Sequence, residues 1–502
     1  MKAINKNTSA LKLAHNVIWN LAGQILPLII AVVAVPILIK YMGMGRYGFL
    51  TLAWVLIGYA GLFDFGISRA MTRLVAVHLA GGDEKGASHI ATVGASFMII
   101  FGIAVGLLLL IFSNLIVSHW LNVPPELQTE ALNSLRFLAL SVPVVLLTAA
   151  YRGILEAHLA FKQVAIIRVA MGLATYLGPL AVLAFSVRLE AVVGIVVLMR
   201  VVANYVHARV CRSTTHFIYH WAVPDRGTTR QLFSLGGWIS VSNFVSPLMT
   251  YMDRFILGGM VSIQSVVYYA TPYDMITRLM VLPSSLMGVL FPVVSGMARD
   301  PIRARATYTA TIRALYVLMF PIAFIAIVLA APLLKIWLGD DFSRHATPVL
   351  QLLAIGVLAN TLAQAPASMI QGIGNPKLMA ITHVIELPLF LLAIWYLTNH
   401  YGIVGTAFSW TARTVVDGVV LYVLAGRKLV KPEFSTAGVL LATLITIALL
   451  GLGFLPNTVS ESLIACAIGL ITFGFFAWFG VLTAVDRANF SKLFQRVSGG
   501  IT

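Results

Sequence analysis

The sequence has 502 residues, of which 59% are hydrophobic and only 10% charged, with a net charge of +16. A helix needs about 20 mostly apolar residues to cross a bilayer, and such runs recur from residue 15 to residue 483. The composition therefore predicts an all-α polytopic membrane protein. It excludes a transmembrane β-barrel, which would show short alternating strands, and two cysteines imply no disulfide framework.

The apolar runs predict about fourteen spanning helices, separated by turns rich in Gly, Pro and Asp. The basic N-terminus leads into an apolar run that is too long for a signal-peptide core, so we expect it to be retained as the first helix. The predicted spans are residues 15–39, 48–70, 88–112, 134–156, 163–186, 189–208, 232–257, 265–290, 308–331, 347–371, 376–398, 402–425, 437–455 and 462–483.

The positive charges are distributed unevenly between the two sides of these spans. Most of the 34 Lys and Arg residues fall in segments on the same side as the N-terminus. Because cytoplasmic loops carry an excess of Lys and Arg, we expect both termini to be cytoplasmic. The same distribution explains the basic net charge without nucleic acid. No loop is long enough for a folded domain, so any energy source would be an ion gradient, the membrane potential or a partner.

The chain also repeats itself. The segment LEAVVGIVVLMR (189–200) resembles HYGIVGTAFSWT (400–411), which places Gly194 at the position of Gly405. Two six-helix halves in the same orientation imply parallel repeats around a central cavity. The predicted division is an N-lobe at 1–220, a C-lobe at 221–430, and two extra helices with a cytoplasmic tail at 431–502.

Four charged residues stand in the apolar stretch from residue 247 to residue 278: Asp253, Arg254, Asp274 and Arg278. A charge at bilayer depth costs about 2.5–3.5 kcal/mol on insertion scales, so it usually faces a partner or a wet cavity. We therefore expect these two helices to form one wall of a polar cavity.

Two segments resemble one family. GMGRYGFLTLAWVLIGYAGLFDFGISRAMTR (43–73) and YMDRFILGGMVSIQSVVYYATPYDMITRLMVLPSSLMGVLFPVVS (251–295) are similar to segments of bacterial Wzx-type O-antigen and polysaccharide flippases. These belong to the multidrug/oligosaccharidyl-lipid/polysaccharide exporter superfamily, and the likeness covers almost the whole chain. It implies alternating access of two lobes in the bacterial inner membrane. It also implies transport of an undecaprenyl-diphosphate-linked oligosaccharide to the periplasmic leaflet.

An anionic diphosphate and a hydrophilic glycan need different side chains. Arginine pairs with phosphate bidentately and stays charged when it is desolvated. We therefore assign the diphosphate to Arg254, Arg278 and Arg413 as first choices. Tyr268 and Tyr269 are the predicted contacts of the glycan, although an interfacial aromatic belt explains such tyrosines equally well.

Coupling to an ion needs a group that binds the ion in one state and releases it in another. The candidates are Asp253, Asp274, Glu386 and Asp417, with H⁺ or Na⁺ as the ion and no other cofactor. A purely structural role stays open for these residues, because Asp274–Arg278 and Arg413–Asp417 are spaced as i,i+4 pairs that can neutralise each other. Glu386 could equally be hydrogen-bonded to a neighbouring helix. We expect Asp64 to brace the end of its span against Arg69 or Arg73.

Two other functions compete with a flippase. A cation-coupled multidrug antiporter of the same superfamily would favour a cavity of carboxylates and apolar walls, whereas several intramembrane arginines favour an anionic cargo. A membrane-embedded glycan polymerase would carry a large periplasmic loop, which this chain lacks. We therefore expect a transporter without catalytic residues or a metal site, with lipids and polymerase or ligase machinery as the partners.

Overall fold

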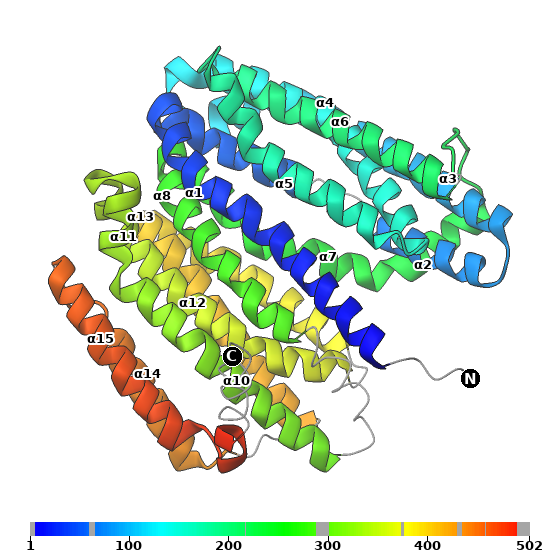
Figure 1. The fold of residues 1–502 in the computed structure, drawn as a ribbon. Coiled ribbons are helices and arrows are strands. Elements are labelled where there is room, and N and C mark those ends of the chain that lie inside the picture. Colours follow the sequence, from blue (N-terminus) through cyan, green and yellow to red (C-terminus); the bar gives the residue numbers. More distant parts are fainter. Residues whose placement is uncertain are drawn as a thin grey trace. The chain divides into compact units, whose positions relative to one another are not determined.

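The computed structural model describes residues 6–59, 66–215, 217–287, 301–372, 376–428, 434–456 and 458–488. These residues are almost entirely helical and contain no β-strand (Figure 1). Contacts between the helices divide the chain into two compact units, Met1–Val267 and Tyr268–Thr502. The predicted lobes at 1–220, 221–430 and 431–502 stay predictions.

Among the described residues, the first unit contains seven α-helices. It packs mainly through α3, α4 and α6, with α1 against α5 and α2 against α3. The helices are α1 (Lys6–Tyr59), α2 (Ile67–Ala80), α3 (Glu84–Leu115), α4 (Gln128–Ala157), α5 (Phe161–Leu183), α6 (Leu189–Thr215) and α7 (Arg226–Met260).

The second unit contains the remaining helices, apart from the first residues of α8. Its strongest packing joins α12 to α13, and α10 packs against α12. The helices are α8 (Ile263–Thr277), α10 (Pro301–Val328), α11 (Ala330–Leu338), α12 (Asp340–Gly372), α13 (Pro376–Lys428), α14 (Thr436–Leu452) and α15 (Val459–Phe476).

The prediction of a polytopic all-α membrane protein is confirmed. Nine helices among the described residues are long and apolar enough to cross a membrane, and α14 adds a shorter apolar one. Two of the long helices each contain two predicted spans, because α1 is kinked at Gly43 and α13 at Gly402. Both glycines have positive φ, at 78° and 57°, a conformation that side chains with a Cβ rarely adopt.

Two short helices were not predicted as separate elements. The chain turns at Gly66, with φ of 73°, and α2 begins after it, although the second predicted span was drawn through to residue 70. Helix α11 follows α10 after one residue and ends at Gly339, with φ of 90°. Hydropathy alone does not separate a short helix from the end of a longer apolar run.

One partly buried ion pair ties three helices of the first unit together. Arg46 on α1 donates through Nε and an Nη to the two carboxylate oxygens of Glu130 on α4, both at 2.8 Å. The same carboxylate accepts a hydrogen bond of 2.8 Å from the backbone N–H of Leu189, at the start of α6. A bidentate Arg–carboxylate pair with a further backbone donor is a strong, geometrically defined contact.

Candidate ion-binding site

A group of titratable side chains inside the second unit is formed by α13, which folds back on itself. The kink at Gly402 turns this helix into two antiparallel arms. In an antiparallel hairpin, residues at similar distances before and after the turn come to lie side by side. The contacts obey that rule, since the hydroxyl groups of Thr398 and Thr406 lie 2.9 Å apart.

The two arms approach each other closely at Gly405. A Cβ placed on this glycine would lie 2.0 Å from the carbonyl oxygen of Leu397, so the space fits only a hydrogen. Further from the kink, the Ser409 hydroxyl reaches the carbonyl oxygen of Ala393 at 3.4 Å. Small residues and hydroxyl groups therefore fix the register of the two arms against each other.

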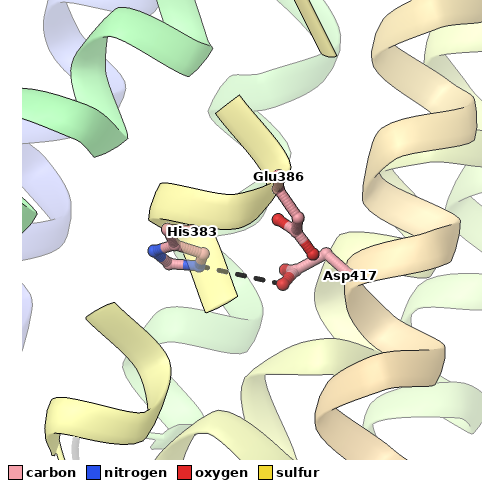
Figure 2. A group of neighbouring side chains, drawn as sticks. All are labelled: His383, Glu386 and Asp417. Carbon is pink, nitrogen blue, oxygen red and sulfur yellow. Dashed lines mark ion pairs between the residues drawn. The ribbon is translucent and has the colours of Figure 1, made fainter. Parts of the chain in front are cut away.

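That register brings three titratable side chains together. His383 and Glu386 come from the first arm and Asp417 from the second, and one ligand atom from each lies within 4.8 Å of the others. Figure 2 shows the Glu386 and Asp417 carboxylates turned toward each other, with the His383 ring on the near side of Asp417. His383 Nε2 lies 3.7 Å from Asp417 Oδ1.

The two carboxylates are buried and His383 is half-buried, and three of the carboxylate oxygens lack a hydrogen-bond partner. Glu386 is 9% exposed and Asp417 8%. Neither oxygen of Glu386, nor Oδ1 of Asp417, has a hydrogen-bond partner. Buried polar atoms normally have one, so an unfilled set at the centre of a helix pair marks a place for a ligand or for stored strain.

Arg413 lies one turn before Asp417, at the spacing of a neutralising pair. Among the described residues, however, Asp417 pairs with His383 and not with Arg413. The Arg413 guanidinium carbon lies 5.3 Å from the centre of the Phe390 ring on the other arm. The group therefore holds two carboxylates whose charges are not cancelled by a direct Arg partner.

The chemistry of this group suits a small cation. Two negative charges within a few ångströms repel each other strongly where the dielectric is low. A bound proton or a metal ion removes that repulsion. Carboxylate oxygens are ligands for hard cations, and a neutral imidazole can add a nitrogen ligand or accept a proton.

Sequence analysis selected Glu386 and Asp417 separately and did not include His383 among the site residues. What the sequence analysis lacked was the register of the hairpin, which decides which residues of the two arms lie opposite each other. Glu386 stands sixteen residues before Gly402 and Asp417 fifteen after it. Folding the span pair at Gly402 would have placed these carboxylates at the same depth, with His383 one turn away on the same arm.

The predicted charges of α7 lie in the first unit. Asp253 is fully buried and Arg254 is 3% exposed. The carboxylate of Asp253 accepts a hydrogen bond of 2.7 Å from the backbone N–H of Arg254. The Arg254 guanidinium carbon lies 5.7 Å from the centre of the Tyr251 ring. Both side chains are thus buried in the last third of α7, and their roles stay predictions.

The other predicted residues of this stretch are in the second unit. Asp274, near the end of α8, and Arg278, in the 3-10 turn after it, are half-buried. The Tyr268 hydroxyl donates to Asp341 at 2.8 Å, and its ring lies on His345. Tyr269 is fully buried. A sugar could reach the half-buried Tyr268 in this conformation but not Tyr269.

The brace predicted for the second span is only partly described. Asp64 lies outside the described residues, so its pairing stays a prediction. Arg69 and Arg73 are exposed on α2 and line a pocket together with Arg152 of α4.

Comparison with known proteins identifies the family. Residues 37–347 match the family described as "Polysaccharide biosynthesis protein". The chain is also 30% identical, over 83% of its length and 98% of the relative's, to a "Putative O-antigen transporter" of Shigella flexneri. The chain belongs to this polysaccharide biosynthesis family. A second family relative, "Probable low-salt glycan biosynthesis flippase Agl15" of Haloferax volcanii, is 24% identical over 49% of this chain and 53% of its own.

Solved structures support the same fold for this member of the polysaccharide biosynthesis family. The structure titled "Lipid II flippase MurJ, inward closed conformation" superposes with a TM-score of 0.70 and 16% identity, over 95% of this chain and 98% of that one. An inward-facing multidrug resistance MATE transporter of the MOP superfamily gives 0.64 and 14%, over 80% and 94%. At these identities the likeness concerns the fold, which is the superfamily fold predicted from the sequence.

Proposed function

We propose that this chain is a flippase for a lipid-linked oligosaccharide, an O-antigen or exopolysaccharide repeat unit carried on undecaprenyl diphosphate. The observation that carries the proposal is the 30% identity to an O-antigen transporter over 98% of that protein's length. Relatives named as transporters and flippases make an enzyme the wrong class, so the chain moves its substrate without changing it.

The proposed route needs cations for the diphosphate and a polar wall for the glycan. Arg254, Arg278 and Arg413 are the proposed diphosphate contacts, because guanidinium groups pair bidentately with phosphate oxygens. Tyr268 and Tyr269 are the proposed glycan contacts, the second of them only in a conformation that exposes its ring.

The group of His383, Glu386 and Asp417 is the proposed ion-coupling site, with H⁺ or Na⁺ as the ion. Its carboxylates are buried and unfilled. Binding of a cation would therefore stabilise the conformation seen here, and release of the cation would destabilise it. A ligand shifts a conformational equilibrium only through its different affinity for the two states. Asp253 and Asp274 are the other candidates for this role.

The proposed location is the bacterial inner membrane with both termini in the cytoplasm. The supporting argument is the excess of Lys and Arg in the segments on the N-terminal side. Polymerase or ligase machinery is the proposed protein partner, because the translocated repeat unit must be polymerised or transferred after it crosses. Membrane lipids cover the apolar helices.

A cation-coupled drug antiporter is the second candidate. It is favoured by the buried carboxylate group of α13, which an antiporter also needs, and by the fold shared with a MATE transporter. The buried Arg254 and the O-antigen transporter relative favour the anionic cargo of a flippase.

The deciding experiment quantifies surface polysaccharide and undecaprenyl-linked oligosaccharide together in cells that lack this protein. We expect loss of the surface glycan and accumulation of lipid-linked repeat units on the cytoplasmic leaflet. Accumulation of single repeats on the periplasmic leaflet would instead indicate a polymerase. Unchanged pools with increased drug sensitivity would establish the antiporter.

The diphosphate assignment is tested by Arg254→Ala, with Arg136→Ala on the exposed face of α4 as the matched control. We expect Arg254→Ala to abolish transport while membrane insertion stays normal, and the control to transport like the wild type. Full activity of the Arg254→Ala protein would refute the assignment.

A further inference from the structure

A basic pocket lies between α2 and α4 in the first unit, and none of the proposed transport residues contributes to it. Its volume is about 430 Å³, within the range of roughly 300–1,000 Å³ that is usual for small-molecule sites. The side chains that line it are those of Ser68, Arg69, Thr72, Arg73, Ala76, Arg152, Glu156, Ala157 and Leu159.

The packing of α2 on α4 creates this concentration of charge. Arg69 and Arg73 are one turn apart on α2, so they lie on the same face of that helix. Gly153 of α4 allows the close approach, because a Cβ there would lie 2.6 Å from the Thr72 hydroxyl oxygen. The neighbouring Arg152 is therefore held beside the two arginines of α2.

The charges of the pocket do not balance. Arg152 lies 3.8 Å from Glu156 in an i,i+4 pair. Within the part of the chain that the structure describes, neither Arg69 nor Arg73 has a hydrogen bond or an ion pair with another side chain. Among the described residues, three guanidinium groups therefore share one carboxylate, and Asp64, the partner predicted for Arg69 or Arg73, lies outside them.

The hydroxyl groups of the lining add little to anion binding. The Ser68 hydroxyl donates to the carbonyl oxygen of Ala149 at 3.3 Å, and the Thr72 hydroxyl donates to that of Ser68 at 2.9 Å. The donors left for an anion are therefore the guanidinium groups, above all those of Arg69 and Arg73, because Arg152 is paired with Glu156. Their planar N–H forks match the oxygens of a phosphate.

The rim of the pocket contains a strained residue. Leu159 has φ of 61° and is 74% exposed. It ends α4 in a Schellman arrangement, in which Ala160 N–H donates to Leu155 and Leu159 N–H to Glu156. Glycine is the usual residue at this position. Strain of this kind gathers at ligand sites, and here an exposed apolar side chain stands beside a cationic pocket.

We propose that this pocket binds the phosphate groups of a lipid headgroup, with the three arginines as donors and Leu159 against the start of the acyl or prenyl chain. The diphosphate of the transported lipid is the first candidate, and this choice rests on the proposed function. Bound there, the substrate would be held at the end of the unit that we propose to be cytoplasmic, before it reaches Arg254.

The test uses the full-length protein in a maltoside detergent, which carries no phosphate. It is done in the Arg254→Ala/Arg278→Ala/Arg413→Ala background, so that the three proposed diphosphate contacts of the transport site do not contribute. Binding of undecaprenyl diphosphate and of phosphatidylglycerol is measured separately by native mass spectrometry. The variants are Arg69→Gln/Arg73→Gln, Glu156→Gln, and Arg212→Gln as the control, an exposed arginine on α6 outside the pocket.

We expect the double arginine variant to weaken diphosphate binding at least tenfold and Arg212→Gln to leave it unchanged. Glu156→Gln should strengthen binding several-fold, because it frees Arg152 from its carboxylate. This increase also protects the test against a variant that merely misfolds.

If the same pattern appears with phosphatidylglycerol alone, the pocket is a phosphate site for membrane lipids and the substrate assignment is wrong. That result would leave the proposed function intact. Binding of both lipids at wild-type strength by the double arginine variant would overturn the pocket itself.

Discussion

The ion pair that joins α1, α4 and α6 and the acidic group inside the α13 hairpin both place charge between helices, but only the first has its hydrogen bonds made. Glu130 accepts two hydrogen bonds from Arg46 and one from the backbone of Leu189. Glu386 accepts none, and Asp417 has an unfilled oxygen. A carboxylate with all its partners holds helices together. A buried carboxylate without partners does not stabilise the fold. Proteins tolerate such a loss of stability at binding sites.

The largest expected effect concerns the acidic group of α13, whose carboxylate oxygens lack hydrogen-bond partners. Asp417→Asn should reduce transport of the lipid-linked oligosaccharide in proteoliposomes at least tenfold. It should leave the melting temperature unchanged or slightly higher, because it removes the repulsion between two buried carboxylates. Glu126→Gln, an exposed carboxylate, is the control. Wild-type transport by Asp417→Asn would exclude the group from ion coupling.

The second prediction breaks the hairpin that assembles this group. Gly405→Ala places a Cβ against the Leu397 carbonyl oxygen, so we expect it to destabilise the protein by up to about 3 kcal/mol through overpacking. Transport should fall as the arms separate.

Gly194→Ala is its matched control, since the sequence repeat equates the two glycines but no atom lies within 4 Å of a Cβ at Gly194. Alanine there should be neutral or stabilise the helix by about 0.5–1 kcal/mol. Equal melting temperatures for the two variants would contradict the close approach at Gly405.

The third prediction concerns Glu130, whose hydrogen bonds are all made. Glu130→Gln should destabilise the first unit by about 2 kcal/mol, because it breaks charge-assisted hydrogen bonds and leaves the half-buried Arg46 without its partner. Transport per folded molecule should stay near the wild-type level.

A double-mutant cycle with Arg46→Met, read from melting temperatures, separates the pair from its surroundings. A loss of transport at unchanged stability would show that Glu130 is more than a brace.

The smallest effect concerns a residue that is strained rather than unfilled. Leu159→Gly should stabilise the protein by about 0.5–1 kcal/mol, because a left-handed conformation costs a side chain about 1–2 kcal/mol and glycine returns part of that in chain entropy. Thermal unfolding with Leu159→Ala alongside gives the answer, since alanine keeps the strain. Stabilisation by alanine as large as by glycine would mean that the exposed side chain, not the backbone, is the source.

Hydropathy predicted the membrane helices because a spanning segment must be apolar over its whole length. Each of the fourteen predicted spans overlaps a helix of the structure. It did not separate α2 and α11, which are too short to be distinguished beside longer apolar runs. The Arg46–Glu130 pair could not be predicted from the sequence for another reason. Its partners are 84 residues apart in the chain, and only packing decides which of many charges meet.

The residues of the acidic group could be predicted from the sequence in part, but their proximity could not. Burial of charge in an apolar span is visible in a sequence, so Glu386 and Asp417 were selected one by one. Their proximity depends on where α13 folds and in what register, which in turn depends on contacts such as Thr398 with Thr406. The same limit applies to the pocket of α2 and α4, since Arg69 and Arg152 become neighbours only through the close approach at Gly153.

Because α13 folds back at Gly402, the acidic group forms only if the number of residues between this glycine and each carboxylate is right. Each residue added to a helix rotates the rest of that helix by about 100° and shifts it by about 1.5 Å. One insertion between Glu386 and Gly402 would thus point Glu386 away from Asp417 while leaving every span as apolar as before. Related chains that keep this group must keep the spacing on both arms or change both together, so the length between the carboxylates and the glycine is itself a marker of the site.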